Sequence, residues 1–342
     1  MRKQKAYLVP VLIVMLFQAI HSNAQDLHFS QYFNSPLLIN PANAGFVPDR
    51  DWRVGINYRN QWASVTDNPY KTMALWGDIQ LFNNSIENGW VGLGGSLLKD
   101  VAGSGSLSST KGFASVAYHQ LLGLKSLLSA GFNIGFANKS IDISKLTFGN
   151  QWNGKFFDAA IPSGEAFAFN SITYFDLQAG LNYAIFPTDN AYLNAGFSVM
   201  HLNRPKESFF NNQDIDVRIE PRFTAFVNGS FKLNDQWIVN PNVYVSKMGN
   251  SYETVAGLNA RYNLSGDGNL QLIGGLYTRL SDAFIPMVGV EWNDLAVTVS
   301  YDATVSSLGT FNQTRGAYEL SIVKSGILSA SGKDVKCPTV RF

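Results

Sequence analysis

The sequence predicts an all-β membrane protein, namely a transmembrane antiparallel up-and-down β-barrel of about 14 strands. Three observations carry this prediction: the composition, the alternation of polarity along the chain, and the lengths of the links between segments. Charged residues make up 15% of the chain and aromatic residues 13%, with 30 glycines. Soluble proteins contain roughly 25% charged residues, so the low value suits a wall that faces lipid. The formal net charge of +1 implies no strong field for nucleic acid or acidic lipid.

Alternating polarity is the second observation. Between Phe175 and Ile185, apolar side chains at the odd positions alternate with mainly polar or small ones, such as Asp176 and Gln178. Leu128 to Phe136 repeats the pattern. In a strand, a period of two sends the two sets to opposite faces. We therefore expect the apolar set to face lipid and the polar set to line the lumen.

Segments of this kind follow one another from Asp51 onward, with turn residues between them. The predicted strands are Asp51–Trp62, Tyr70–Phe82, Gly89–Lys99, Thr110–Leu121, Leu127–Asn138, Thr173–Phe186, Ala191–Asn203, Arg222–Leu233, Gln236–Lys247, Tyr252–Asn263, Leu270–Leu280, Phe284–Trp292, Leu295–Ala303 and Arg315–Lys324.

The link lengths are the third observation. Links after even-numbered strands are short, such as Asn234–Asp235 and Asn293–Asp294, whereas several links after odd-numbered strands are long. Outer-membrane barrels have short periplasmic turns and longer external loops, so the barrel is expected to begin in the periplasm. The short links Met248–Ser251 and Ser281–Ala283 depart from this pattern. The predicted long external links are Asp100–Ser109, Lys139–Ile172, Arg204–Pro221 and Thr304–Thr314.

The N-terminus predicts a cleaved secretory signal over residues 1–24, with a basic start, an apolar run from Ala6 to Ile20 and a small-residue cleavage site. A membrane anchor is the alternative. No later apolar run approaches the about 20 residues that a spanning helix needs. A closed barrel is the other structure that satisfies the backbone in lipid. The expected organisation is a signal (1–24), an N-terminal plug or docking segment (25–50), the barrel (51–325) and a C-terminal periplasmic tail (326–342).

Two further groups of residues fit a barrel. Tryptophans near strand ends are expected to form an aromatic girdle at the membrane interfaces: Trp52, Trp62, Trp90, Trp237 and Trp292. Charged residues on lumen faces either pair across the interior or line a selective path, and both interpretations stay open: Arg53, Arg59, Asp176, Glu253, Arg261, Arg279, Glu291, Asp302 and Glu319.

No motif for chemistry emerges from the sequence. His119 and His201 lie near strand ends without an acidic residue at metal-ligand spacing, so they are expected to be structural. No nucleophile elbow, phosphate loop or cysteine–metal cluster is recognised, so no catalytic, cofactor-binding or metal-binding residue is predicted. The enzymatic alternative is a lipid-acting Ser–His dyad that uses one of these histidines. Cys337 is the only cysteine, so it stays a free thiol or pairs between molecules.

The stretch Leu27–Phe46 is apolar and aromatic but has neither a helical nor a strand period. If exposed, it would form a contiguous apolar patch, and such patches mark interaction sites. It is therefore expected either to plug the barrel or to dock a partner, and the two roles are compatible.

Several motifs along the chain, in this order, resemble the PorP/SprF family of type IX secretion system membrane proteins from Bacteroidota. They are Phe29-Ser-Gln-Tyr32, Asn40-Pro-Ala-Asn-Ala-Gly45, Tyr58-Arg-Asn-Gln-Trp62, His201-Leu-Asn-Arg-Pro205 with Glu207-Ser208, Ile285-Pro-Met-Val-Gly289 with Glu291-Trp292, Tyr301-Asp302 with Gly316-Ala-Tyr-Glu-Leu320, and Cys337-Pro338 with Arg341-Phe342.

The resemblance implies a non-enzymatic outer-membrane barrel without cofactors that supports export and surface anchoring of a secreted protein or adhesin, including adhesins used in gliding motility. The implied partners are the C-terminal domain of type IX cargo, periplasmic type IX components and outer-membrane lipid, but not nucleic acid. The alternative is a general porin or a small-hydrophobe transporter. The residues expected to bind a partner are Phe29, Gln31, Tyr32, Asn40, Pro41, Gly45, Arg204 and Pro205.

Overall fold

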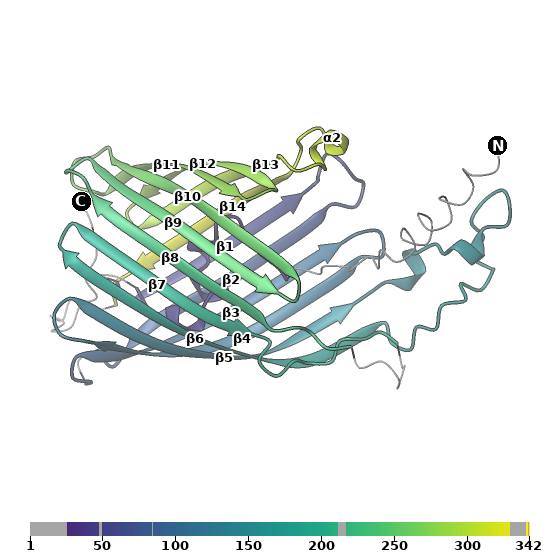
Figure 1. Ribbon diagram of the computed structural model, residues 1–342, viewed down its shortest axis with the longest axis horizontal. Coiled ribbons are helices and arrows are strands. Elements are labelled where there is room, and N and C mark those ends of the chain that lie inside the picture. The colour runs from purple at the N-terminus through teal and green to yellow at the C-terminus, as the bar shows by residue number, and fades with distance from the viewer. Residues whose placement is uncertain (1–25, 48–49, 84, 211–216, 329–339, 341) are drawn as a thin grey trace, which may run out of the picture.

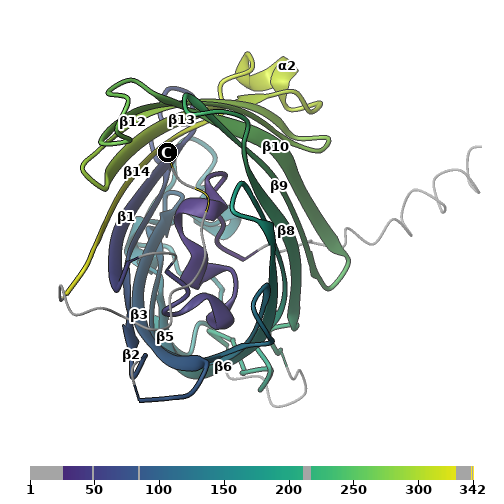
Figure 2. The same ribbon diagram turned by 90° about the vertical axis from the view of Figure 1, so that its left-hand side faces the viewer.

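A computed structural model describes residues 26–47, 50–83, 85–210, 217–328, 340 and 342. Within these residues, strands β1 to β14 pair antiparallel with their sequence neighbours, and β14 pairs with β1 to close one barrel (Figure 1, Figure 2). The predicted fold class is therefore confirmed. The predicted signal (1–24), Cys337 and most of the predicted tail lie outside the described residues. None of the described helices is long and apolar enough to cross a membrane.

The strands begin and end close to the predicted bounds. They are β1 (Trp52–Gln61), β2 (Tyr70–Leu81), β3 (Gly89–Ala102), β4 (Leu107–Leu121), β5 (Ser126–Ser140), β6 (Ser171–Thr188), β7 (Ala191–Met200), β8 (Arg222–Lys232), β9 (Trp237–Met248), β10 (Ser251–Asn263), β11 (Leu270–Arg279), β12 (Ala283–Trp292), β13 (Leu295–Thr304) and β14 (Ala317–Gly326).

The predicted long link Asp100–Ser109 is wrong. β3 and β4 continue their pairing to Ala102 and Leu107, which leaves only a four-residue turn over 103–106. The Gly-Ser composition suggested a loop, but Gly103 at a φ of +67° turns the chain tightly and lets the ladder extend. The predicted strand Ala191–Asn203 is also too long, because β7 ends at Met200 and His201 has a φ of +57°.

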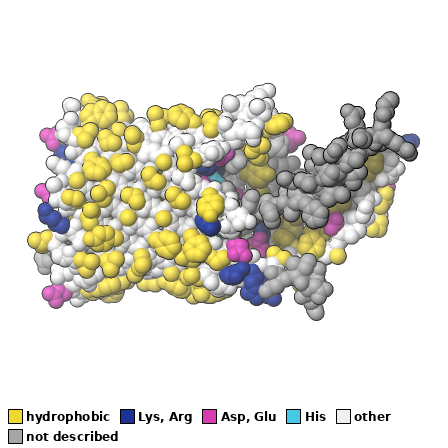
Figure 3. Space-filling view, viewed as in Figure 1, with side chains coloured by type: hydrophobic (Ala, Val, Ile, Leu, Met, Phe, Trp, Pro, Cys, Tyr) yellow, Lys and Arg dark blue, Asp and Glu magenta, His cyan; other side chains and the backbone are white. Residues whose placement is uncertain are grey.

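The two faces of the wall follow the predicted alternation. In β6, Asp176, Gln178 and Asn182 are buried inside, whereas Leu181 and Tyr183 are exposed outside. Figure 3 shows apolar side chains spread over the outer wall, with charged side chains gathered mainly toward its two rims. One girdle residue is wrong: Trp90 points inward, where it is 1% exposed and donates a hydrogen bond to the carbonyl of Gly45.

The barrel has a short-turn end and a long-loop end. Turns such as 189–190 and 293–294 link strands at the short-turn end, where β1 begins and β14 ends. The β5–β6 loop (141–170) and the β7–β8 loop (201–221) lie at the opposite end and extend beyond the rim (Figure 1). In bacterial outer-membrane barrels generally, short turns face the periplasm and longer loops face the outside. The long-loop end also carries short helical turns: η4 (Ile143–Lys145), η5 (Gly149–Gln151) and α2 (Gly309–Asn312).

The N-terminal stretch lies inside the barrel (Figure 2). It contains three single 3₁₀ turns: η1 (Tyr32–Asn34), η2 (Pro36–Leu38) and η3 (Pro41–Asn43). Proline starts η2 and η3 because its fixed φ suits the first helical position. The side chain of Asn40 caps η3 by accepting a hydrogen bond from the backbone N–H of Ala42 at 2.9 Å. Separate short turns explain why this stretch has no single sequence period.

Candidate functional site

Residues 26–47 form what we call the lumen segment. Its first residue, Asp26, contacts Lys111 and His201 at the long-loop end of the lumen. Its later residue Gly45 receives a hydrogen bond from Trp90 at the start of β3, at the short-turn end. The segment therefore runs along the lumen between the two ends before the chain enters β1.

A carboxylate of the wall holds the backbone of the lumen segment. The two oxygens of Glu319 accept hydrogen bonds from the backbone N–H groups of Ser30 and Gln31, at 2.7 and 3.0 Å. The hydroxyl of Ser30 donates to Asp302 at 2.7 Å. Arg59 contacts both carboxylates and is itself 4% exposed. Such charge-assisted bonds are the strong class, and the segment depends on side chains far away in the sequence.

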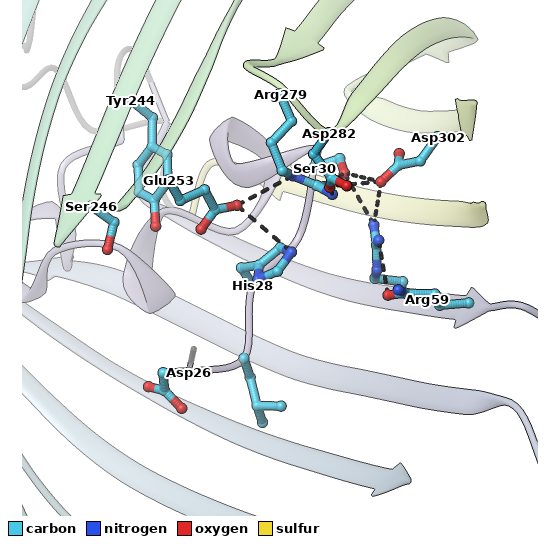
Figure 4. Close-up of polar contacts among 12 residues, drawn as sticks. Asp26, His28, Ser30, Arg59, Tyr244, Ser246, Glu253, Arg279, Asp282 and Asp302 are labelled. Atoms are coloured by element: carbon cyan, nitrogen blue, oxygen red, sulfur yellow. Dashed lines mark hydrogen bonds and ion pairs between the residues drawn. The ribbon is translucent and has the colours of Figure 1, made fainter. Parts of the chain in front are cut away.

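A second group of charges surrounds the start of the segment (Figure 4). Arg279 bridges Asp302 at 2.9 Å and Glu253 at 3.3 Å, and it also contacts Ser30. Glu253 in turn lies 3.6 Å from His28. Burial lowers the pKa of His28 to about 4, despite the opposing effect of Glu253, so this imidazole is neutral near pH 7.

Asp26 lies between cations and is held as a carboxylate. Lys111 contacts it at 2.6 Å, and His201 and Arg222 lie 3.3 and 3.8 Å away. Although burial opposes its ionisation, these partners keep the pKa of Asp26 well below its usual value. Burial also opposes the charge on His201, but its bonds to Asp176 and Asp26 raise its pKa overall.

Apolar side chains of the lumen segment also pack against the barrel wall. Tyr32 packs on Tyr244 with ring centroids 5.0 Å apart, and Phe33 stacks on Tyr277 at 5.0 Å. Leu37 is 1% exposed. Full burial of one large apolar side chain stabilises the docked state by about 1.5–3 kcal/mol relative to leaving that side chain in water. The segment is therefore held by packing as well as by charge.

Glycines in the wall let the segment approach closely. A methyl group placed on Gly92 would lie 1.8 Å from the carbonyl oxygen of Ala44. One placed on Gly131 would lie 2.4 Å from the backbone of Pro41, and one on Gly180 would lie 1.9 Å from Asn40. Any larger residue at these positions would push the segment away from the wall.

The two barrel histidines do not form a lipid-facing dyad. His119 does contact a serine, since its Nδ1 lies 2.7 Å from Ser129 Oγ, but both side chains are buried on the lumen face. Its Nε2 is bonded to the carbonyl of Ala44 at 2.8 Å, which leaves no free nitrogen to act as a base. No group of three metal-ligating side chains occurs within the described residues.

The predicted partner-binding residues fall into two places. Phe29, Gln31, Tyr32, Asn40, Pro41 and Gly45 are buried in the lumen, and Pro205 is buried at the long-loop end. Arg204 is exposed and pairs with Glu220 at 2.8 Å. Their role in partner binding stays a prediction. Sequence reasoning missed Ser30, although the inward charges Arg59, Asp302 and Glu319 that surround it were identified as lumen residues.

The long loops of β5–β6 and β7–β8 join into one surface, which we call the external platform: residues 141–170, 201–210 and 217–221. The backbone N–H groups of Ala168 and Phe169 donate to the carbonyl of Phe209 at 3.0 and 3.1 Å. The rings of Phe167 and Phe210 stack with centroids 4.9 Å apart. These contacts tie two loops that are far apart in the sequence into one unit.

The platform presents aromatic side chains to solvent. Trp152, Phe156, Phe157, Phe169 and Phe210 are between 43% and 58% exposed. Trp152 and Phe157 pair across a short bridge, with ring centroids 5.2 Å apart. Exposed aromatic groups of this kind mark protein interaction sites.

Solved structures share the fold. A mutant of the monoaromatic hydrocarbon channel TodX matches at a TM-score of 0.52 and 10% identity, over 85% of this chain and 93% of that chain. The Ralstonia pickettii toluene transporter TbuX matches at a TM-score of 0.51 and 11% identity, over 86% and 94%. Identities this low show a common barrel architecture and nothing about the transported molecule.

A comparison with curated protein sequences finds no significant match. The profile of one known family does match, over residues 21–323. The match spans the lumen segment and almost the whole barrel, and neither the family nor the similar structures are enzymes. The chain therefore belongs to the PorP/SprF family of type IX secretion system membrane proteins.

Proposed function

We propose that this barrel supports the export and surface anchoring of a secreted protein or adhesin through the type IX route. The barrel fold and the family point to an outer-membrane location. The predicted cleaved signal is part of this proposal, because it would deliver the chain to the periplasm. The partners would be the C-terminal domain of the cargo and periplasmic type IX components.

The observation that carries the anchoring role is the external platform. Two loops that are tied together by backbone hydrogen bonds and carry exposed aromatic rings offer a preformed surface on which a protein partner can dock. Aromatic side chains at the centre of interfaces contribute most of the binding energy in many complexes. Phe156 and Phe157, at 58% and 50% exposed, are the best placed to contact a docked cargo domain.

The lumen segment supports the same choice over a porin. Its charge-assisted bonds to Glu319 and Asp302 and its packing on Tyr244 hold it inside the lumen. We propose that it plugs the barrel, so that the resting protein passes no solutes. The similar hydrocarbon channels share only the barrel architecture with this chain.

The test is a pull-down of the tagged barrel from its native outer membrane in mild detergent, followed by mass spectrometry. We expect a type IX cargo protein to copurify with the wild type. The double substitution Phe156→Ser and Phe157→Ser should reduce its recovery at least tenfold. Phe311→Ser is the matched control, because Phe311 is 86% exposed at the same end but outside the platform. Equal recovery with both variants, or a lone barrel, would contradict the proposal.

A further inference from the structure

A cavity of about 300 Å³ lies between the lumen segment and the barrel wall, at the lower end of the size range of small-ligand sites. The lumen segment forms one side of this cavity, and strands β7 to β10 form most of the other side (Figure 2). The cavity shares part of its lining with a larger one that reaches the β10–β11 turn at the short-turn end. A small molecule can therefore enter from that end of the barrel.

Asparagines dominate the lining of this cavity, which we call the asparagine cavity. Seven of its eighteen lining residues are asparagines. Asn194 of β7 pairs in register with Asn228 of β8, and Asn228 pairs with Asn242 of β9, so the three form a row across the wall. Asn240 and Asn259 form another such pair between β9 and β10. Neutral amides, each able to donate and to accept hydrogen bonds, thus replace the charges that fill the long-loop end of the lumen.

The two cations in the lining already have anionic partners. Arg53 donates to both oxygens of Asp78 at 2.9 Å, and Arg261 pairs with Glu291 at 2.8 Å. Among the described residues, no carboxylate lines the asparagine cavity itself, since Asp267 lines only the larger cavity at its entrance. A ligand without net charge therefore fits this lining best.

One amide of the asparagine row lacks a hydrogen-bond partner. Asn194 is 6% exposed, and its buried Oδ1 accepts no hydrogen bond from the described residues. By contrast, Asn240 donates to Asn259, and both Asn242 and Asn259 donate to Tyr277. A buried acceptor is costly to leave unpaired, and a hydroxyl group of a ligand in the cavity could donate to it.

Aromatic rings line the same cavity, among them Phe33 of the lumen segment and Tyr192 and Phe226 of the wall. A sugar ring carries hydroxyl groups around its edge and C–H groups on its faces. It can therefore bond to the amides while a face packs on an aromatic ring. An extended peptide grows by about 3.3 Å with each residue, so all but the shortest peptides would outgrow this cavity.

We propose that the asparagine cavity binds an uncharged sugar of one or two rings, and that Asn194 accepts a hydrogen bond from one of its hydroxyl groups. Because the cavity lies between the lumen segment and the wall, the sugar would contact both. A ligand that binds only the docked state stabilises that state, so the sugar would hold the lumen segment in the barrel. The proposal is independent of the anchoring role and of the external platform.

Binding is tested by saturation-transfer NMR titrations with glucose, N-acetylglucosamine and maltose. The barrel is kept in a polyoxyethylene detergent, because detergents with sugar headgroups would compete. At least one sugar should bind with saturation, and Asn194→Leu should weaken its binding at least tenfold. Asn133→Leu is the matched control and should bind as the wild type does, because Asn133 is equally buried and its Oδ1 is also unpartnered, but it lies outside the cavity.

Saturable binding of none of the three sugars, or equal weakening by both substitutions, would overturn the proposal. Tighter binding of the uncharged peptide N-acetyl-alanyl-alanine amide than of any sugar would overturn it too, and would assign the cavity to peptides. If Asn194→Leu does not give a barrel that resists SDS before heating, Asn240→Leu makes the same test. Asn240 lines the cavity, is half-buried and bonds to Asn259 of the wall.

The effect on the lumen segment is tested by hydrogen exchange of residues 29–46. At a sugar concentration of about ten times the dissociation constant, exchange protection should rise about tenfold. Asn194→Leu should abolish this rise at the same sugar concentration, and Asn133→Leu should keep it. Exchange in the external loop 141–170 should not change. Unchanged protection of residues 29–46 at a saturating sugar concentration would show that the sugar binds elsewhere and would refute the proposed site.

Discussion

Glu319 is the residue on which the lumen segment depends most directly. Its two oxygens serve the backbone of Ser30 and Gln31, and it also contacts Arg59. In Glu319→Gln, an amide NH₂ group replaces one of the two acceptor oxygens. This NH₂ group then faces a backbone N–H of Ser30 or Gln31, and two donors cannot form a hydrogen bond. Breaking a buried ion pair on one side costs about 3–5 kcal/mol. We expect hydrogen-exchange protection of residues 29–35 to fall at least a hundredfold, roughly 3 kcal/mol.

The matched control for Glu319→Gln is Glu291→Gln. Glu291 also pairs with an inward arginine, Arg261, at 2.8 Å, but its partner does not hold the lumen segment. Protection of residues 29–35 should stay at the wild-type level in this variant. If both variants lose protection equally, the effect belongs to the lumen charge balance as a whole and not to the bonds of Glu319.

His28 makes the docking of the segment sensitive to acid. Its pKa is about 4 when buried and about 6.5 when free, so the released segment binds more protons between these values. Docking should therefore weaken by roughly 1.5 kcal/mol between pH 6.5 and pH 5. Despite burial, the pKa of His201 is raised by Asp176 of the wall and by Asp26 of the segment; the part due to Asp26 acts in the opposite sense, because docking weakens as the pH rises through that pKa.

Exchange protection of residues 29–46, corrected for the intrinsic rate, measures this dependence. Protection should be highest near pH 6.5 and lower on both sides. His28→Asn should abolish the decline between pH 6.5 and pH 5 and leave the decline above pH 6.5 intact. A decline that persists unchanged in His28→Asn would assign the acid effect to another group.

At the scale of elements, β5 has to leave room for η3. A methyl group at Gly131 would lie 2.4 Å from the backbone of Pro41, which cannot rotate away. Overpacking of this kind costs about 1–3 kcal/mol. We expect Gly131→Ala to expose residues 40–46 to exchange while the barrel stays folded. Gly274→Ala in β11 is the control, because a methyl group there meets no described atom within 4 Å. Equal protection in both variants would mean that the close approach is not limiting.

The strands could be predicted from the sequence because each one carries its own signal. A period of two, as in β6, reports both the strand and its lumen face without knowledge of its neighbours. The short turn between β3 and β4 was not predicted, because Gly103 and the serines beside it are equally typical of a long loop and of a tight turn. The inward direction of Trp90 was not predicted because it depends on the hydrogen bond to Gly45 of the lumen segment, 45 positions away, which no local sequence pattern reports.

The candidate site could be predicted only in part, for a related reason. The inward charges Arg59, Asp302 and Glu319 were recognisable on lumen faces, but their pairing and the seating of Ser30 among them join residues up to 289 positions apart. No local sequence pattern predicts a contact between residues that are so far apart in the chain. The external platform shows the same limit, since loop length was visible but the bond between Phe169 and Phe209 was not.

At the scale of the whole molecule, the barrel and the lumen segment are separable in principle. The wall closes through its own backbone ladders, from β1 with β2 round to β14 with β1, and none of these pairings uses the lumen segment. Backbone pairing is what membrane insertion requires of a barrel. The segment instead fills the space that the wall encloses, through the bonds of Ser30 and Gln31 and the packing of Tyr32.

Deleting residues 25–46 should therefore leave a barrel that inserts into the membrane but no longer seals it. In a planar lipid bilayer, we expect the deletion variant to pass a lasting ion current and the full-length protein to pass none. Cargo display at the cell surface should be lost at the same time, because the segment is also proposed to take part in docking. Steady current through the full-length protein would show that the segment is no seal and would favour a porin. Failure of the deletion variant to insert would show instead that the wall needs its lumen segment to fold, which would place the charges around Ser30 within the folding of the barrel rather than within a gate.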